Sequence, residues 1–518
     1  MELSRRDFLK QYVLGAGIVA MSGQFGDITG TVNKQRRPNI LWLIAEDIST
    51  DLGCYGTPLV STPNINKLAA EGALYTNAFT TSPVCSPSRS AFMTGMYQTA
   101  IAAHHQRSNV ARPNWPDYKN KPLPQNVKVI TEYFRSVGYF MCNSAGLNWH
   151  MRGKTDFNFV TEKEPFDGTD WEQRRSNQPF FAQVNFRQTH REYERDTERP
   201  IEPAKVKLPS YYPDHPVVRR DWADYLENIQ ILDRKVGQFL KRLEEDGLAD
   251  NTIVFFFGDN GRDHLRGKQF LYEGGIHIPL IIRWPSHIKP NTVVDDLVSA
   301  IDFGPTCMKL VGIKLPANMQ GRPFIGHNVK KRECIFAARD RVDGTYDRIR
   351  CVRTERFKYI RNYYTDRPYI KFDTGTYMTV FMPVLTVMEV LREEGRLTPL
   401  QASFMIPSRP VEELYDLQND TEEINNLADN PNFQKDLKKL RTMLEDWIKR
   451  TNDMGQMPEE TQVTVQSEQY HRDRNKRQME RQGLSPDITP QEYLKYWEKQ
   501  LLSIKKRDNK EYYDEQKE

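Results

Sequence analysis

Residues 39–47 read Asn39-Ile40-Leu41-Trp42-Leu43-Ile44-Ala45-Glu46-Asp47, and this stretch decides the fold class. Its first seven residues form an almost unbroken apolar run between Pro38 and the acidic pair. A run of this length without polar alternation is typical of a strand that is buried on both faces of a parallel sheet. The acidic pair then lies at the carboxyl end of the strand, where ligands gather in open α/β sheets.

Further apolar runs alternate with helical patterns over the first three hundred residues. We expect strands over residues 138–142, 179–186, 251–257 and 278–284, and helices over 64–70, 127–136 and 221–245. This alternation predicts an α/β fold with a large, mixed, mostly parallel sheet sandwiched by helices.

The pattern changes after Gly321-Arg322-Pro323. Short strands over 333–338, 348–354 and 359–363, followed by helices near 384–393 and 433–450, predict a smaller α+β domain. From about residue 452 the chain is highly charged and poor in aliphatic residues, with one helix expected over 490–505. We therefore assign residues 37–330 to the large domain, 331–450 to the smaller domain, and 451–518 to a charged tail that wraps the body or is partly disordered.

The composition fits a soluble protein with a well-solvated surface. The chain has 518 residues, 38% of them hydrophobic, and a mean hydropathy of −0.70. Its 73 basic and 69 acidic residues give a net charge of +4, and we expect no nucleic-acid partner. The six cysteines are scattered without CxxC spacing, which argues against a zinc site and against a scaffold built on disulfides.

The N-terminus has the pattern of an export signal. Residues 4–10 read Ser4-Arg5-Arg6-Asp7-Phe8-Leu9-Lys10 and precede a mildly apolar run from Tyr12 to Met21. The run contains Gly15 and Gly17 and is too short for a transmembrane span. We expect a twin-arginine signal over residues 1–30, engagement of the Tat export machinery, and a periplasmic or secreted protein.

Two pairs of oxygen donors follow buried strands. Glu46 and Asp47 come after the first strand, and Asp259 and Asn260 follow the strand over 251–257 in Gly258-Asp259-Asn260-Gly261. Either pair alone would suit a turn or a helix cap. Together they can converge on a hard divalent cation, which prefers oxygen ligands.

The stretch Cys85-Ser86-Pro87-Ser88-Arg89, followed by Thr94-Gly95, carries the most specific signal. By itself it also suits a free cysteine in a proline-bounded turn that leads into a helix. This C-x-P-S-R motif resembles the signature of the formylglycine-dependent (type I) sulfatases, which have the alkaline-phosphatase-like fold. The resemblance implies that a maturation enzyme oxidises Cys85 to formylglycine (3-oxoalanine), whose hydrate attacks sulfur.

Other blocks resemble the same family in the family's order. They are Arg37-Pro38-Asn39-Ile40, Tyr272 to Pro279 with Arg283-Trp284-Pro285, and Glu413 to Leu417 with Asn425 to Ala428. The resemblance implies a Ca²⁺ site built from Glu46, Asp47, Asp259, Asn260 and the modified Cys85. The family usually has two aspartates where this chain has Glu46 and Asp47.

The resemblance also implies roles for cationic residues. Arg89 would steady the hydrate, and a position four residues after Cys85 puts it on the same helix face. Lys268 and His190 match the family residues that bind sulfate and protonate the leaving alcohol. The block Gly146-Leu147-Asn148-Trp149-His150 departs from the usual G-K-W-H, so the lysine role passes to Lys154, as in sulfamidase-like branches, and His150 can still serve at the site.

Four further residues are candidates for binding substrate. His104 and His105 follow the helix that begins near Cys85; a role at the helix terminus is the alternative to contact with sulfate or sugar. Arg339 and Arg341 open the smaller domain and would grip a sugar carboxylate or a second sulfate. A surface ion pair is the alternative for both arginines.

These features predict an exported sulfatase that hydrolyses sulfate esters of a glycosaminoglycan or of an algal polysaccharide such as ulvan. The enzyme alternatives are a sulfamidase, because of the Lys154 block, and a phosphoester or phosphonate hydrolase of the same superfamily, because fold alone does not select the anion. The alternative without catalysis is a polyanion-binding protein in which Cys85 stays a thiol.

Overall fold

The computed structural model of the chain describes residues 37–107 and 121–503, so the predicted export signal lies outside the described residues. The strands are β1 (Asn39–Ala45), β2 (Ala73–Phe79), β3 (Phe140–Ala145), β4 (Asn148–Arg152), β5 (Phe180–Phe186), β6 (Thr252–Gly258), β7 (His277–Arg283), β8 (Thr292–Val294), β9 (Val298–Ser299), β10 (Cys334–Arg339), β11 (Ile349–Thr354), β12 (Phe357–Asn362) and β13 (Glu412–Asp416). The helices are α2 (Pro63–Ala70), α3 (Cys85–Thr94), α4 (Ile130–Ser136), α5 (Pro216–Glu245), α6 (Glu273–Ile276), α7 (Phe303–Leu310), α8 (Tyr377–Phe381), α9 (Pro383–Glu393), α10 (Pro399–Ala402), α11 (Gln434–Thr451), α12 (Thr461–Arg481) and α13 (Pro490–Leu502).

The large sheet is built around β1, which pairs in parallel with β5 on one side and β6 on the other. The strand order is β4-β3-β5-β1-β6-β7-β2-β8, and β9 also pairs with β2. β7 runs antiparallel to β6 and β2, and β4 runs antiparallel to β3. The sheet is therefore mixed and mostly parallel, which confirms the predicted fold class.

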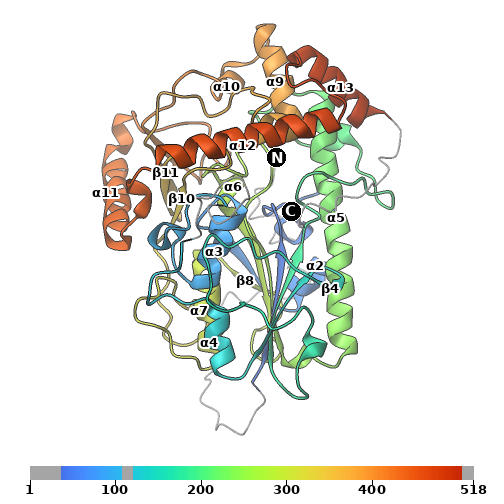
Figure 1. The fold of residues 1–518 in the computed structure, drawn as a ribbon, viewed down its shortest axis with the longest axis vertical. Helices are drawn as coiled ribbons and strands as arrows, with labels where there is room; N and C mark the ends of the chain where they lie inside the picture. Colours follow the sequence, from blue (N-terminus) through green and yellow to red (C-terminus); the bar gives the residue numbers. More distant parts are fainter. Residues whose placement is uncertain (1–36, 108–120, 504–518) are drawn as a thin grey trace.

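Helices cover both faces of this sheet (Figure 1). Successive side chains of β1 point to opposite faces, so that Leu41 and Leu43 pack in one core while Ile40 and Trp42 pack in the other. The long helix α5, with α2, lies on the first face, and α3, α4 and α7 lie on the second. Burial on both faces explains why the strand reads as a continuous apolar run.

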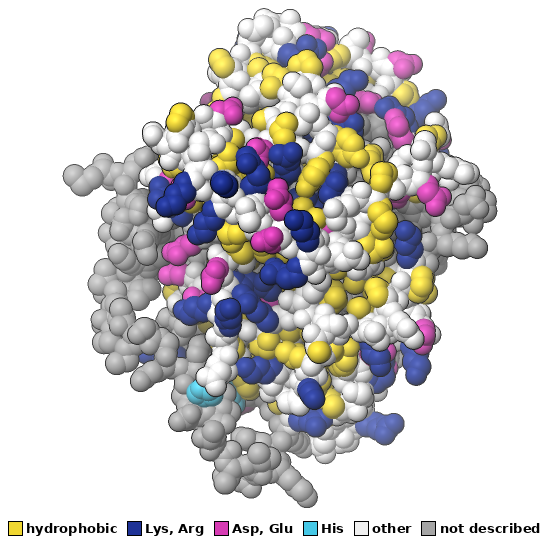
Figure 2. Space-filling model, turned by 90° about the vertical axis from the view of Figure 1, so that its left-hand side faces the viewer, with side chains coloured by type: hydrophobic (Ala, Val, Ile, Leu, Met, Phe, Trp, Pro, Cys, Tyr) yellow, Lys and Arg dark blue, Asp and Glu magenta, His cyan; other side chains and the backbone are white. Residues whose placement is uncertain are grey.

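The smaller α+β part holds a second sheet, in which β10, β11, β12 and β13 are antiparallel neighbours. Helix α11 packs on it, with the Trp447 ring stacked on Phe336 at a centroid distance of 5.1 Å. On the face seen in Figure 2, Lys and Arg side chains are scattered among acidic and hydrophobic ones.

The charged C-terminal stretch contains two helices where the sequence predicts one. Helix α13 matches the predicted helix from Pro490 and buries Tyr493 and Trp497. Helix α12, which crosses above the large sheet in Figure 1, was not predicted because its polar residues outnumber its apolar ones. Among residues 37–107 and 121–503, no helix has the length and apolar character that a bilayer crossing requires.

Candidate active site

The ends of β1 and β6 bring the acidic residues together. Because the two strands are parallel neighbours, Glu46 and Asp47 lie at the same sheet edge as Asp259. The Asp259 N–H donates to the Ala45 carbonyl at 3.0 Å, and the Asp47 N–H donates to Asp259 Oδ1 at 3.1 Å. Asp47 has φ of 50°, a left-handed conformation that is uncommon outside glycine and that clusters at functional sites.

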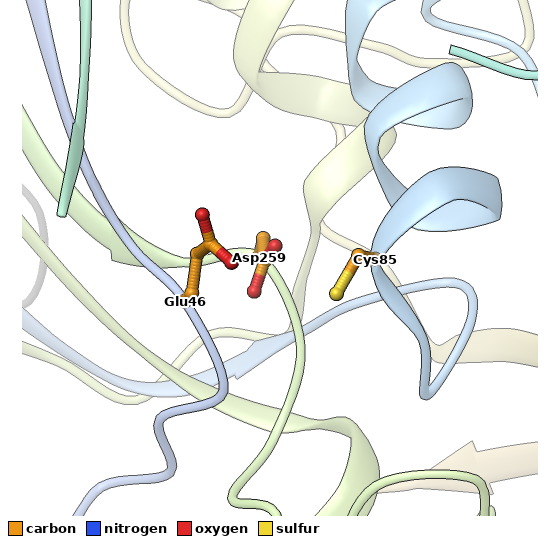
Figure 3. Close-up of side chains that lie close together, drawn as sticks. All are labelled: Glu46, Cys85 and Asp259. Atoms are coloured by element: carbon orange, nitrogen blue, oxygen red, sulfur yellow. The ribbon is translucent and has the colours of Figure 1, made fainter. Parts of the chain in front are cut away.

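Helix α3 places Cys85 opposite these carboxylates. Cys85 is the first residue of the helix, and Pro87 lies in the first turn, where the missing N–H leaves no helical hydrogen bond unmade. The Ser88 hydroxyl donates to the Asp259 carbonyl at 2.5 Å and so attaches the helix to the end of β6. Figure 3 shows the side chains of Cys85, Glu46 and Asp259 pointing toward one another. One potential metal-ligand atom from each of the three lies within 4.8 Å of the others.

The Cys85 thiol is buried, with 1% of its surface exposed, and lies 3.7 Å from Asp47 Oδ1. Burial raises the pKa of this thiol far above its usual range, although Lys154 and Lys268 act in the opposite direction. A thiol that stays protonated at neutral pH is a poor nucleophile. The encoded side chain is therefore badly suited to attack an ester without chemical conversion.

Arg89 lies one turn beyond Cys85 and is fully buried. Its Nε and Nη2 lie 3.0 and 2.9 Å from Asp259 Oδ2, and Nη1 donates to Asn185 Oδ1 at 2.6 Å. A buried guanidinium requires such partners because an unpaired buried charge is strongly destabilising. Arg89 thus has the predicted place beside the cysteine.

Two lysines reach the cluster from loops. Lys154 Nζ lies 2.7 Å from Glu46 Oε2, and Lys268 Nζ lies 2.7 Å from Asp47 Oδ2. A Cβ on Gly153 would come within 2.3 Å of the Ser144 carbonyl, so only glycine lets the chain approach closely enough to deliver Lys154. The sequence resemblance assigned to Lys154 the role of the lysine in the usual motif. In the structure, the Lys154 ammonium contacts the carboxylate cluster.

Electrostatics keep the carboxylates of Glu46 and Asp47 charged. Burial by itself would raise the pKa of Glu46, but Lys154 and Arg89 lower it well below its usual range. Burial opposes and Lys268 favours the charged form of Asp47 in the same way, and the pKa of Asp47 is lowered. Burial dominates for Asp259, whose pKa is raised.

These residues fit a hard divalent cation. Glu46, Asp47 and Asp259 offer carboxylate oxygens in a buried cluster beside Cys85. The Oδ1 atom of Asn260 is buried, and it has no hydrogen-bond partner among the residues that the structure describes. An unsatisfied buried amide oxygen beside carboxylates is the donor set that Ca²⁺ or Mg²⁺ prefers.

His190 also reaches the cluster. Its Nε2 lies 3.7 Å from Asp47 Oδ2, and its Nδ1 lies 2.6 Å from the Arg191 carbonyl. Burial, followed by the charge of Lys268, lowers the pKa of His190. The cluster thus contains predicted site residues from the ends of β1 and β6, from α3, and from the loops that carry Lys154, His190 and Lys268.

The structure gives different surroundings to the other candidates. His105 is buried and its Nδ1 accepts the Arg341 N–H at 3.2 Å, while the Arg341 side chain pairs with Glu459 at 2.7 Å. His104 is buried next to His105, and Arg339 pairs with Asp347. Within the described ranges, no hydrogen bond or ion pair joins these four residues to Cys85. His105, Arg339 and Arg341 have polar partners, whereas the buried Nδ1 of His104 has no hydrogen-bond partner in the described residues.

His150 also lies apart from the cluster. In β4 the side chains of Trp149 and Met151 are half-buried, and His150 belongs to the alternate, exposed positions. Its surface hollow is shared with Trp149 and Arg242 rather than with Cys85. The strand alternation therefore places His150 on the exposed side of β4, and its assignment to the site stays a prediction.

Sequence reasoning missed several residues in contact with the cluster. Asn185, the partner of Arg89, is the next-to-last residue of the buried strand β5, and a polar residue at that position was a usable signal. Asp156 Oδ2, 3.9 Å from Lys154 Nζ, and Asp263 Oδ2, 3.7 Å from Lys268 Nζ, lie in loops whose patterns carry no such signal.

Sequence comparisons with known proteins agree on one family. A family model described as Sulfatase matches residues 38–313, and one described as N-sulphoglucosamine sulphohydrolase, C-terminal, matches residues 261–376. An ulvan-active sulfatase of Formosa agariphila is 36% identical over 472 residues, which cover 82% of this chain and 76% of the relative. Human N-sulphoglucosamine sulphohydrolase is 26% identical over 475 residues, covering 81% of this chain and 91% of the relative.

A structural comparison bears on the fold alone. The crystal structure of a phosphonate monoester hydrolase of Agrobacterium radiobacter is similar with a TM-score of 0.57 and 16% sequence identity. The match covers 80% of this chain and 96% of the other. The same architecture therefore carries more than one kind of tetrahedral anion chemistry.

Proposed function

Because the chain belongs to the sulfatase family, we propose that it hydrolyses sulfate esters of a sulfated carbohydrate with a formylglycine at position 85 and a bound Ca²⁺. One observation carries this proposal. The Cys85 Sγ lies at the start of α3, 3.7 Å from Asp47, in a buried cluster that joins three carboxylates to Arg89, Lys154 and Lys268. A sulfate ester needs such a concentration of positive charge for its oxygens.

Each side chain of the cluster has a role in binding the sulfate or in the reaction. A formylglycine at position 85 would supply the nucleophilic hydroxyl, and Glu46, Asp47, Asp259 and Asn260 would hold a Ca²⁺ that supplies positive charge for a sulfate. Arg89 is fixed by Asp259 and Asn185 and orients the residue-85 side chain on the same helix face. Lys154 and Lys268 bind sulfate oxygens, and Lys268 or His190 donates the proton that the departing alcohol requires.

One relative and one family model suggest substrates. The relative from Formosa agariphila is an ulvan-active sulfatase, which favours a sulfated algal polysaccharide. The match of residues 261–376 to the C-terminal model of N-sulphoglucosamine sulphohydrolase makes N-sulfate cleavage the second candidate. A screen of ulvan oligosaccharides against N-sulfated and O-sulfated glucosamine separates the two.

We expect aryl sulfate to be turned over and aryl phosphate to be turned over far more slowly when both are assayed in parallel. The phosphate would be preferred if the chain shared the chemistry of the phosphonate hydrolases rather than only their fold.

Mass spectrometry of the Cys85 peptide from native protein should show an aldehyde. An unmodified thiol together with undiminished binding of polyanions would instead support the binding protein without catalysis.

Ca²⁺ is expected to stabilise the protein and to be needed for turnover. A bound cation would neutralise the carboxylates that otherwise pair with Lys154 and Lys268. Because such a ligand binds only the folded protein, a concentration of about a hundred times its Kd adds about 2.7 kcal/mol to the free energy of unfolding. The midpoint of thermal unfolding should therefore fall on treatment with a chelator and recover with added Ca²⁺. An Asp259→Asn variant should lose most of this response; an equal response in that variant would contradict the assigned ligand set.

We also propose that the protein is exported. The Arg5-Arg6 motif is the basis for engagement of the Tat machinery and for a periplasmic or secreted location. Fractionation of cells that express the wild-type chain and an Arg5→Lys, Arg6→Lys variant tests it. Retention of only the variant in the cytoplasm is the expected outcome, and equal export of both would contradict it.

A further inference from the structure

Lys268 has a second acidic neighbour besides Asp47. Asp263 Oδ2 lies 3.7 Å from Lys268 Nζ and accepts a hydrogen bond from the Tyr377 hydroxyl. Asp263 is fully buried, and its Oδ1 finds no hydrogen-bond partner in the described part of the chain. The Lys268 ammonium also lies 5.5 Å from the centre of the Tyr377 ring. Lys268 therefore stands between the carboxylate cluster and the Asp263–Tyr377 pair.

Asp263 is held firmly by the large domain. Its backbone carbonyl accepts the Nε–H of Arg191 at 2.9 Å. The Arg191 guanidinium is paired with both carboxylate oxygens of Asp221 on α5, at 2.6 and 2.8 Å. A planar, two-point pair of this kind fixes orientation as well as distance, so the Asp263 loop cannot easily move away from Lys268.

Tyr377 comes from the C-terminal half and opens helix α8. Two contacts from the charged tail hold this segment in place. The Tyr493 hydroxyl of α13 donates to the Val380 carbonyl at 2.9 Å, and Asn475 Nδ2 of α12 donates to the Gly375 carbonyl at 2.8 Å. The tail helices thus reach the active centre through Tyr377.

We propose that Asp263 and Tyr377 are positioning residues that hold the Lys268 ammonium toward the oxygen of the departing alcohol. This inference rests on the proposed sulfatase function. A lysine side chain is a flexible stem with a point charge, so a single partner does not fix the direction of its protons. A second carboxylate, itself oriented by the Tyr377 hydroxyl on a loop whose backbone Arg191 holds, restricts the ammonium to the space between Asp47 and Asp263.

Tyr377→Phe tests the proposal because it removes the hydroxyl and keeps the ring. General-acid assistance matters most for a basic leaving group. We expect kcat for phenyl sulfate to fall on the order of tenfold, with less than about a threefold loss for para-nitrophenyl sulfate and little change in KM. Asp263→Asn, which keeps the shape but removes the charge that faces Lys268, should give the same dependence on leaving group with a larger loss.

Tyr493→Phe is the matched control, since it also removes one hydroxyl bond to α8 but does not touch Lys268. It should leave the dependence on leaving group as in the wild type. Equal losses across the aryl sulfate series in Tyr377→Phe, or the same selective loss in Tyr493→Phe, would overturn the positioning role. A wild-type protein that turns over neither aryl sulfates nor sulfated oligosaccharides would overturn the proposed function, and this inference with it.

Discussion

Replacement of Cys85 by alanine is expected to abolish turnover of sulfate esters while the protein remains folded. The side chain at position 85 is the only group of the cluster that formylglycine formation can convert into a nucleophile. Removal of an enzyme nucleophile costs on the order of a millionfold in kcat, so the remaining rate should be close to background. Activity on para-nitrophenyl sulfate and the midpoint of thermal unfolding are the two measurements.

Matched variants make this result specific. Cys334→Ser changes a half-buried cysteine on β10, away from the cluster, and should keep full activity. Cys85→Ala should retain the stabilisation by Ca²⁺ in part, because the carboxylates of Glu46, Asp47 and Asp259 are unchanged. Sulfatase activity retained by Cys85→Ala would show that the chemistry does not pass through residue 85.

The fold could be predicted as far as apolar runs reveal it. The run before Glu46 and the run over 251–257 both proved to be buried central strands, because burial on two faces leaves a continuous apolar pattern. Strand β2 was missed because Thr76 and Asn77 interrupt it at a register shift opposite β7. The antiparallel direction of β7 could not be predicted either, because an apolar run does not reveal whether a strand runs parallel or antiparallel to its neighbours.

The site was predictable where residues follow strand ends and was not predictable where contacts come from distant loops. Parallel pairing of β1 and β6 forces Glu46 and Asp259 together, and local spacing places Arg89 beside Cys85. Tyr377 follows no strand of the large sheet, and it reaches Asp263 only because α8 packs back onto the large domain. His150 shows a limit of motif reasoning, because a motif position does not reveal that the side chain lies at an exposed position of β4.

The second large effect concerns the buried lysine that joins the two parts of the molecule. Lys358 of β12 is fully buried, and its Nζ lies 2.8 Å from a carboxylate oxygen of Glu273 in α6 and 2.8 Å from one of Glu423. Lys358→Met should destabilise the protein by about 3–5 kcal/mol, because removal of one partner leaves buried charges uncompensated. The measurement is the shift in the midpoint of urea unfolding.

Arg356→Ala is the control, since the Arg356 side chain is 47% exposed in its pair with Asp416 and exposed ion pairs contribute little to stability. The pH dependence of the free energy of unfolding shows whether the stability lost in Lys358→Met comes from uncompensated charge. Burial raises and Lys358 lowers the pKa of Glu273, so loss of the lysine should raise that pKa in the folded state. A carboxyl with a raised folded pKa binds a proton more tightly when folded, so acidification stabilises the variant relative to neutral pH. The deficit of Lys358→Met should therefore shrink as pH falls from 7 toward 5; a deficit that is constant or grows would show that lost packing, rather than uncompensated charge, is its cause.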